Sequence, residues 1–89
     1  MISHLRGRVV SVSAGTCVME CAGVGYEVHC PVETASRLKP GQEALLHVHH
    51  HLSVDHAGGG GELLYGFSAP EDKTVFRLLM TVSGVGPRL

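Results

Sequence analysis

The chain has 89 residues, a net charge of −1 with histidine neutral, and 44% hydrophobic residues without a tryptophan. This length suits one small domain, and the balanced charge excludes an overall basic surface of the kind that grips nucleic acid or an anionic membrane. The N-terminus lacks the apolar core of a secretory signal, and no stretch approaches the roughly 18 apolar residues of a membrane span. The sequence therefore predicts a soluble cytoplasmic protein.

The first third of the chain alternates apolar and polar side chains. Residues 5–12 (LRGRVVSV) and residues 16–21 (TCVMEC) are separated by a short turn. A third alternating stretch, residues 26–32 (YEVHCPV), contains Pro31, which cannot donate a hydrogen bond to a neighbouring strand. Alternation with a period of two is typical of half-buried strands, so these stretches predict three strands in meander order.

Three cysteines lie within these stretches: Cys17, Cys21 and Cys30. They are odd in number and show no CxxC spacing, which argues against a disulfide framework. Their apolar surroundings predict reduced, buried thiols.

The middle of the chain contains a short helical stretch and two further strands. Residues 33–39 (ETASRLK) predict one or two helical turns, which end at the Pro-Gly pair that follows. Residues 42–54 (QEALLHVHHHLSV) and 62–68 (ELLYGFS) predict the fourth and fifth strands. Between them lies a loop with four consecutive glycines.

The period changes at residues 69–82 (APEDKTVFRLLMTV), where apolar side chains recur at helical spacing: Val75, Leu78, Leu79 and Val82. Pro70 suits the first position of a helix, and Glu71 and Asp72 suit the first turn, where the helix dipole favours anions. The sequence thus predicts a mainly β fold, a five-stranded OB-type barrel with a short helix, followed by this second helix.

A histidine cluster on the predicted fourth strand comprises His47, His49, His50 and His51, with Asp55 and His56 nearby. His47, His49 and His51 share one face there, about 6.6 Å apart along the strand. This spacing is long for three ligands of one tetrahedral zinc, although two of them with a partner from elsewhere could bind one. The other interpretation is that the imidazoles stay neutral and form a polar strand face or a subunit interface, without a metal ion.

The sequence shows no catalytic constellation. No serine lies in a nucleophile-elbow context, and there is neither a P-loop nor a GxGxxG loop. The cysteines lie in apolar strands rather than beside the positive charges that activate a thiolate. The prediction is a non-enzymatic protein without a cofactor.

The tripeptide Gly-Val-Gly occurs twice. In AGVGYEV, residues 23–25 lie between two strands and predict a turn. In SGVGPRL, Gly84, Val85 and Gly86 follow a helix and precede a proline that could begin another. A hairpin of this kind would expose backbone N–H groups beside Arg88 and suit phosphate, whereas a helix end followed by a linker is the alternative.

The order of these motifs resembles one family over the whole chain, in register: MISHLRG, GVGYEVHCP, GQEALLHVHHHL, LLYGF and FRLLMTVSGVGPRL. They are similar to the RuvA subunits of the bacterial Holliday junction branch migration complex. The resemblance implies an OB-fold domain at residues 1–68 that assembles a homotetramer, with an octamer of two tetramers as the alternative assembly. It also implies that residues 69–89 begin a helix-hairpin-helix domain, cut short at Leu89 within its first motif.

The same resemblance implies a function and its partners. A RuvA-like subunit would bind four-way junction DNA without catalysis of its own. A third domain, absent here, would recruit the RuvB ATPase motor for branch migration in recombination and repair, and the RuvC resolvase would act on the same junction.

The resemblance also implies two sets of site residues. Gly84, Val85, Gly86 and Arg88 match the first DNA-binding hairpin, whose amides would meet phosphates. An acidic pin, which repels phosphates at the junction centre, would lie in the loop between the fourth and fifth strands. Asp55 matches its first acid and His56 stands where a second acid is usual, which leaves Glu62 as the supporting carboxylate.

Two other functions stay open on the residues alone. A stand-alone OB module could bind single-stranded nucleic acid, provided that aromatic side chains form a stacking platform. The candidates for that platform are Tyr26, Tyr65, Phe67 and Phe76. The histidine cluster could instead define a metal-binding oligomerisation domain.

Overall fold

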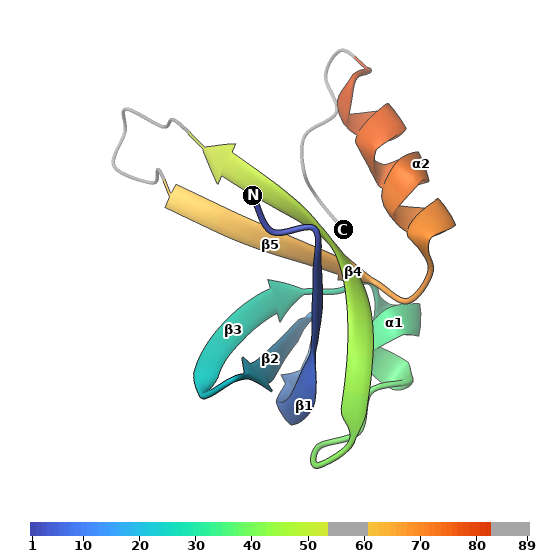
Figure 1. Ribbon diagram of the computed structural model, residues 1–89. Helices are drawn as coiled ribbons and strands as arrows, with labels where there is room; N and C mark the ends of the chain where they lie inside the picture. The colour runs from blue at the N-terminus through green and yellow to red at the C-terminus, as the bar shows by residue number, and fades with distance from the viewer. Residues whose placement is uncertain (54–60, 83–89) are drawn as a thin grey trace.

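A computed structural model describes residues 1–53 and 61–82 of the chain. Five strands form a closed barrel in the order β1-β2-β3-β5-β4 (Figure 1). The strands are β1 (His4–Ser13), β2 (Thr16–Cys21), β3 (Val24–His29), β4 (Glu43–Ser53) and β5 (Gly61–Phe67), and the helices are α1 (Val32–Ser36) and α2 (Pro70–Met80). This architecture confirms the predicted mainly β, OB-type barrel with a short helix between its third and fourth strands.

Antiparallel ladders join β1 to β2, β2 to β3, β1 to β4 and β4 to β5, and a parallel pairing of His29 with Tyr65 closes the barrel.

The first Gly-Val-Gly copy is only partly a turn. Ala22 and Gly23 have positive φ angles of 52° and 84° and reverse the chain, whereas Val24 already begins β3. β3 therefore starts two residues before the predicted strand, because the turn needs only two residues with positive φ.

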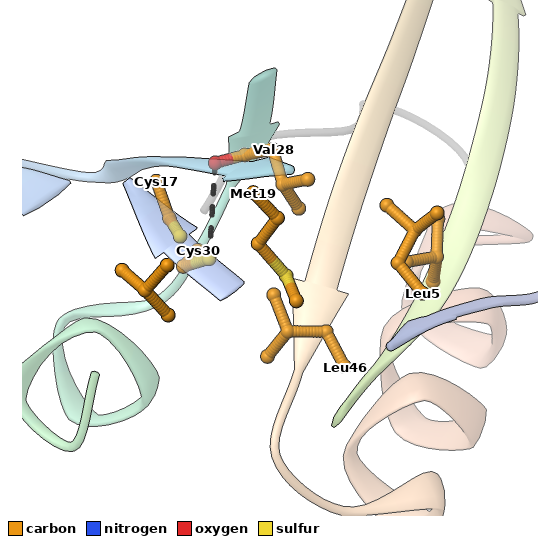
Figure 2. Packing of buried hydrophobic residues seen from close by; sticks show 8 residues of the cluster. Leu5, Cys17, Met19, Val28, Cys30 and Leu46 are labelled. Carbon is orange, nitrogen blue, oxygen red and sulfur yellow. Dashed lines mark hydrogen bonds between the residues drawn. The ribbon is translucent and has the colours of Figure 1, made fainter. Parts of the chain in front are cut away.

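The barrel interior is filled by small and medium apolar side chains without an aromatic ring. The buried set is Leu5, Val9, Cys17, Met19, Val28, Cys30, Leu46 and Val48. Figure 2 shows six of these labelled side chains gathered between the strands. Along β1, β2 and β4 the residues of this set lie two or four positions apart, as expected for strands with one buried face.

The prediction that all three thiols are buried is confirmed for two of them and is wrong for Cys21, which lies at the end of β2. Cys17 and Cys30 are free and buried, whereas Cys21 is partly exposed. The Cys30 thiol lies 3.8 Å from the Val28 carbonyl oxygen (Figure 2). Burial, together with the nearby Cys17, raises the pKa of Cys30 to about 12, so this thiol stays protonated and unreactive at neutral pH.

Helix α2 packs against the outside of the barrel beside β4 and β5 (Figure 1). It begins at Pro70 with Glu71 and Asp72 in its first turn, as predicted. The side that contacts the barrel carries Phe76 and Met80, while the recurring apolar residues are exposed: Val75, Leu78, Leu79 and Val82. Neither helix of the described residues is long and apolar enough to cross a membrane.

Candidate functional site

The predicted site residues fall mostly on two segments outside the described residues. Asp55 lies in residues 54–60, and Gly84, Val85, Gly86 and Arg88 lie in residues 83–89. Glu62 is the predicted site residue that the structure places. It is the second residue of β5, and the end of β4 and the start of β5 project beyond the other strands (Figure 1).

The Glu62 carboxylate contacts His50 of β4. Its Oε1 lies 2.8 Å from Nε2 of His50, and the exposed fractions of the two side chains are 64% and 12%. In the ladder, His50 is opposite Leu64 and Leu52 is opposite Glu62, so the pair is a diagonal contact on one face of the hairpin. A mostly exposed carboxylate is thereby attached to a mostly buried imidazole.

The other ring nitrogen of His50 accepts a hydrogen bond from the N-terminal segment. The backbone N–H of Ile2 donates to Nδ1 at 3.1 Å. Sequence reasoning counted His50 within the cluster but missed this bridging position. The period of two could have indicated it, since His50 alternates with His49 and faces the same side as the buried Val48.

His49, whose side chain alternates with that of His50 along β4, contacts α2. His49 packs with ring-centroid distances of 5.6 Å to Phe76, 6.5 Å to Tyr65 and 5.9 Å to His51. The Nε–H of Arg77 donates to Nδ1 of His49 at 3.1 Å. This face of β4 therefore packs against α2 of the same chain. Neither interpretation of the histidine cluster from the sequence, as a metal site or as a polar face or subunit interface, included this role.

The metal alternative has no geometric support in the described part of the chain. No group of three or more His, Cys, Asp or Glu side chains among residues 1–53 and 61–82 is placed to share a metal ion. His49 and His50 are instead each engaged through Nδ1 with a donor from the protein.

Lys73 completes the attachment of α2. Its ammonium group donates to the carbonyl oxygen of Ser3 at 3.0 Å and to the Ser3 hydroxyl at 3.3 Å. Burial, and then the nearby Arg77, lowers the pKa of Lys73. Both cations on this side of α2 thus hold the helix to the barrel, which limits what they can offer to a phosphate.

His49 makes the stability of this contact depend on pH. Burial, reinforced by the positive charges of Arg77, His51, Lys73 and His50, lowers the pKa of His49 from its ordinary value of 6.5. Below about pH 6.5 the unfolded chain binds this proton and the folded chain does not, so protonation favours unfolding until the lowered pKa is reached. The stabilisation that neutral His49 provides is therefore complete above pH 6.5 and is lost as the pH falls.

We expect the free energy of unfolding of the wild type to fall toward that of a His49→Gln variant as the pH decreases from about 8 to about 5. Denaturant titrations at a series of pH values measure this difference. A His4→Gln variant, which alters an exposed histidine, serves as the control and should run parallel to the wild type. A constant gap between wild type and His49→Gln would show that His49 does not resist protonation.

The aromatic side chains do not form a stacking platform. Tyr65, Phe67 and Phe76 are buried in one cluster between the barrel and α2, and Tyr26 is half-buried. Base stacking needs an accessible ring face, so the burial of these rings disfavours the single-strand alternative.

A groove of about 350 Å³ lies between α1 and α2. Its lining includes Pro31, Phe67 and Val75, and among the residues that the structure describes it contains the carboxylates of Glu33 and Asp72 but no lysine or arginine. Because phosphate contacts require positive groups or backbone amides, this groove does not suit a nucleic acid backbone.

The closed five-stranded barrel, with α1 between β3 and β4, defines an OB-fold domain. Comparison with known families then identifies which one. The model of the RuvA N terminal domain family matches residues 1–58. The chain therefore belongs to the RuvA N-terminal domain family, as its motifs indicated.

Curated relatives agree with this assignment. The protein named Holliday junction branch migration complex subunit RuvA from Acidobacterium capsulatum is 46% identical over the whole of this chain, which covers 43% of that relative. Proteins of the same name from Corynebacterium efficiens and Marinobacter nauticus are 45% and 41% identical, and the chain covers 41% of each. The chain thus spans less than half the length of these relatives.

Proposed function

We propose that this chain is the N-terminal part of a subunit that binds Holliday junctions and acts in branch migration. The match of the whole chain to proteins named as RuvA subunits of that complex carries the proposal. In it, residues 1–68 scaffold a tetramer, and residues 69–89 begin a helix-hairpin-helix domain. The subunit itself performs no catalysis, and a RuvB motor supplies ATP hydrolysis, with RuvC acting on the same junction.

In this proposal the segment between β4 and β5, together with the start of β5, and the segment that follows α2 in the sequence act on DNA in opposite ways. The amides of Gly84, Val85 and Gly86, with Arg88, bind phosphates without reading sequence. Asp55 and Glu62 place negative charge at the junction centre and repel the phosphates of the strands that must separate there. The exposure of the Glu62 carboxylate at the projecting start of β5 supports this second role.

The near-neutral charge of the chain is compatible with such a division of labour. A barrel that scaffolds subunits and repels phosphates at one point needs no basic surface, and the cations beside β4 are already engaged in holding α2. Most of the grip on DNA would then come from residues beyond the barrel.

We expect this 89-residue chain to bind a four-way junction at least about tenfold more weakly than full-length RuvA of Acidobacterium capsulatum, because it offers fewer phosphate contacts. A gel-shift titration of both proteins at one fixed salt concentration measures the difference. A linear duplex of the same arm sequence is the control, and both proteins should prefer the junction. Equal affinity of the two proteins for the junction would show that these 89 residues supply most of the phosphate contacts. That result would contradict the proposal that most DNA binding comes from residues beyond the barrel.

A further inference from the structure

His50 lies where three separate segments of the chain meet. It belongs to β4, it accepts a hydrogen bond from the backbone of the N-terminal segment at Ile2, and it contacts the start of β5 at Glu62. The N-terminal segment is held there by two further bonds: the N–H of Val48 donates to the carbonyl oxygen of Ser3, and Lys73 donates to the same oxygen. The imidazole is thus fixed on both sides.

The Ile2 contact determines which tautomer His50 adopts. A backbone amide can only donate, so Nδ1 of His50 must carry the lone pair and the ring proton must lie on Nε2. That proton points to a carboxylate oxygen 2.8 Å away, which can only accept. The two hydrogen bonds therefore require the same neutral tautomer and support each other.

We infer that His50 is a positioning residue that holds the Glu62 carboxylate as a fixed negative charge at the start of β5, facing the DNA junction. A free glutamate with 64% exposure would sample many rotamers and spread its charge over a large volume. Attachment to a 12% exposed imidazole confines that charge. The inference rests on the proposed function, in which Glu62 repels phosphates.

Two substitutions separate the roles of the two ring nitrogens. The side-chain amide of asparagine lies about as far from the backbone as Nδ1, so in His50→Asn its oxygen can accept from Ile2 but its NH₂ group does not reach Glu62. The amide of glutamine lies about as far out as Nε2, so His50→Gln can donate to Glu62 but leaves the Ile2 N–H without its acceptor. A Glu62→Gln variant keeps the shape and removes the charge.

The measurement is the ratio of the dissociation constants of the 89-residue chain for a linear duplex and for a four-way junction, at one low salt concentration. In the proposal the Glu62 carboxylate repels phosphates, and the continuous backbone of a linear duplex would cross the centre of the site, whereas the arms of a junction diverge from it. We therefore expect Glu62→Gln and His50→Asn each to strengthen duplex binding more than junction binding, and so to lower this preference for the junction about threefold to tenfold, as suits one charge near the protein surface. We expect His50→Gln to retain the preference but to unfold at lower denaturant concentration. Glu33→Gln, which neutralises an exposed carboxylate on α1, is the matched control and should change neither quantity.

Distinct results overturn the inference and the proposed function. If Glu62→Gln lowers the junction preference while His50→Asn leaves it intact, Glu62 repels phosphates but His50 does not position it. If neither variant changes the preference, the inference fails while junction binding stands. If the wild type shows no preference for the junction, the proposed function fails.

The tautomer provides a test that does not require DNA. Nitrogen-15 NMR of the His50 ring at neutral pH should show a proton on Nε2 and none on Nδ1. The opposite tautomer would exclude the two hydrogen bonds and overturn the positioning role independently of any binding result.

Discussion

Replacing Gly7 with alanine is expected to lower the free energy of unfolding by about 3 kcal/mol, a large part of the stability of a domain of this size. Gly7 is buried in β1. A Cβ atom there would overlap the carbonyl oxygen of Glu20 on β2 and would lie 2.7 Å from Sγ of Cys21. The oxygen belongs to the backbone of a paired strand, so relief requires β1 and β2 to separate locally.

Gly25→Ala is the matched control for this prediction. Gly25 is also a strand glycine, yet the nearest atom to its Cβ would be Cγ1 of Val18 at 3.9 Å, an ordinary contact distance. We expect this variant to stay within about 0.5 kcal/mol of the wild type or to be slightly more stable, since alanine restricts the unfolded chain.

Gly66→Ala should fall between these two variants. Its Cβ would lie 2.6 Å from Cγ1 of Val28 and 3.0 Å from Cδ1 of Leu46, which are side-chain atoms that can shift in part. Urea denaturation followed by circular dichroism gives the three values under one set of conditions. If Gly7→Ala matched Gly25→Ala, the close approach of β1 and β2 at Gly7 would be refuted.

Phe76→Ala is expected to release α2 from the barrel, at a cost of about 3 kcal/mol in the free energy of its docking. Phe76 is the buried residue of α2, with 7% exposure. Its ring centroid lies 5.1 Å from that of Phe67 and 5.2 Å from that of Tyr65. Alanine would leave this aromatic cluster without the ring that joins helix and barrel, and the bonds of Lys73 and Arg77 are too exposed to replace it.

Amide hydrogen exchange distinguishes release of the helix from unfolding of the whole domain. In Phe76→Ala, the amides of α2 should lose protection while those of β1 and β2 keep most of theirs, because the barrel interior is a separate cluster. Leu78→Ala is the control: Leu78 is 62% exposed, so its loss should cost less than about 1 kcal/mol. Protection of α2 that survives in Phe76→Ala would show that polar contacts alone hold the helix.

The two helices show which structural features a sequence pattern can predict and which it cannot. The start of α2 at Pro70 follows from local chemistry, since proline and acidic residues favour a first turn in any context. The side of α2 that faces the barrel cannot be predicted from the local sequence, because Val75, Leu78 and Leu79 satisfy the helical period as well as Phe76 does. The short α1 ends at Ser36, three residues before the predicted end, since isolated helical turns have little intrinsic stability.

In the histidine cluster, too, the local sequence pattern predicts which side chains share a face but not which distant residues they contact. The alternation of side chains along β4 predicts that His47, His49 and His51 share one face of the strand and that His50 lies on the other. It does not predict that Arg77 would reach His49 or that Glu62 and Ile2 would meet at His50, since these partners lie 12 to 48 residues away.

The sequence by itself determined the five strands, the start of α2 and membership in the RuvA N-terminal domain family, because periodicity and motif order are properties of the linear chain. The tertiary structure decided the rest: the closure of the barrel between β3 and β5, the need for glycine at position 7, and the tautomer of His50. Each of these depends on which atoms of distant segments come within a few ångströms. That proximity is set by packing of the whole barrel, and no local period encodes it.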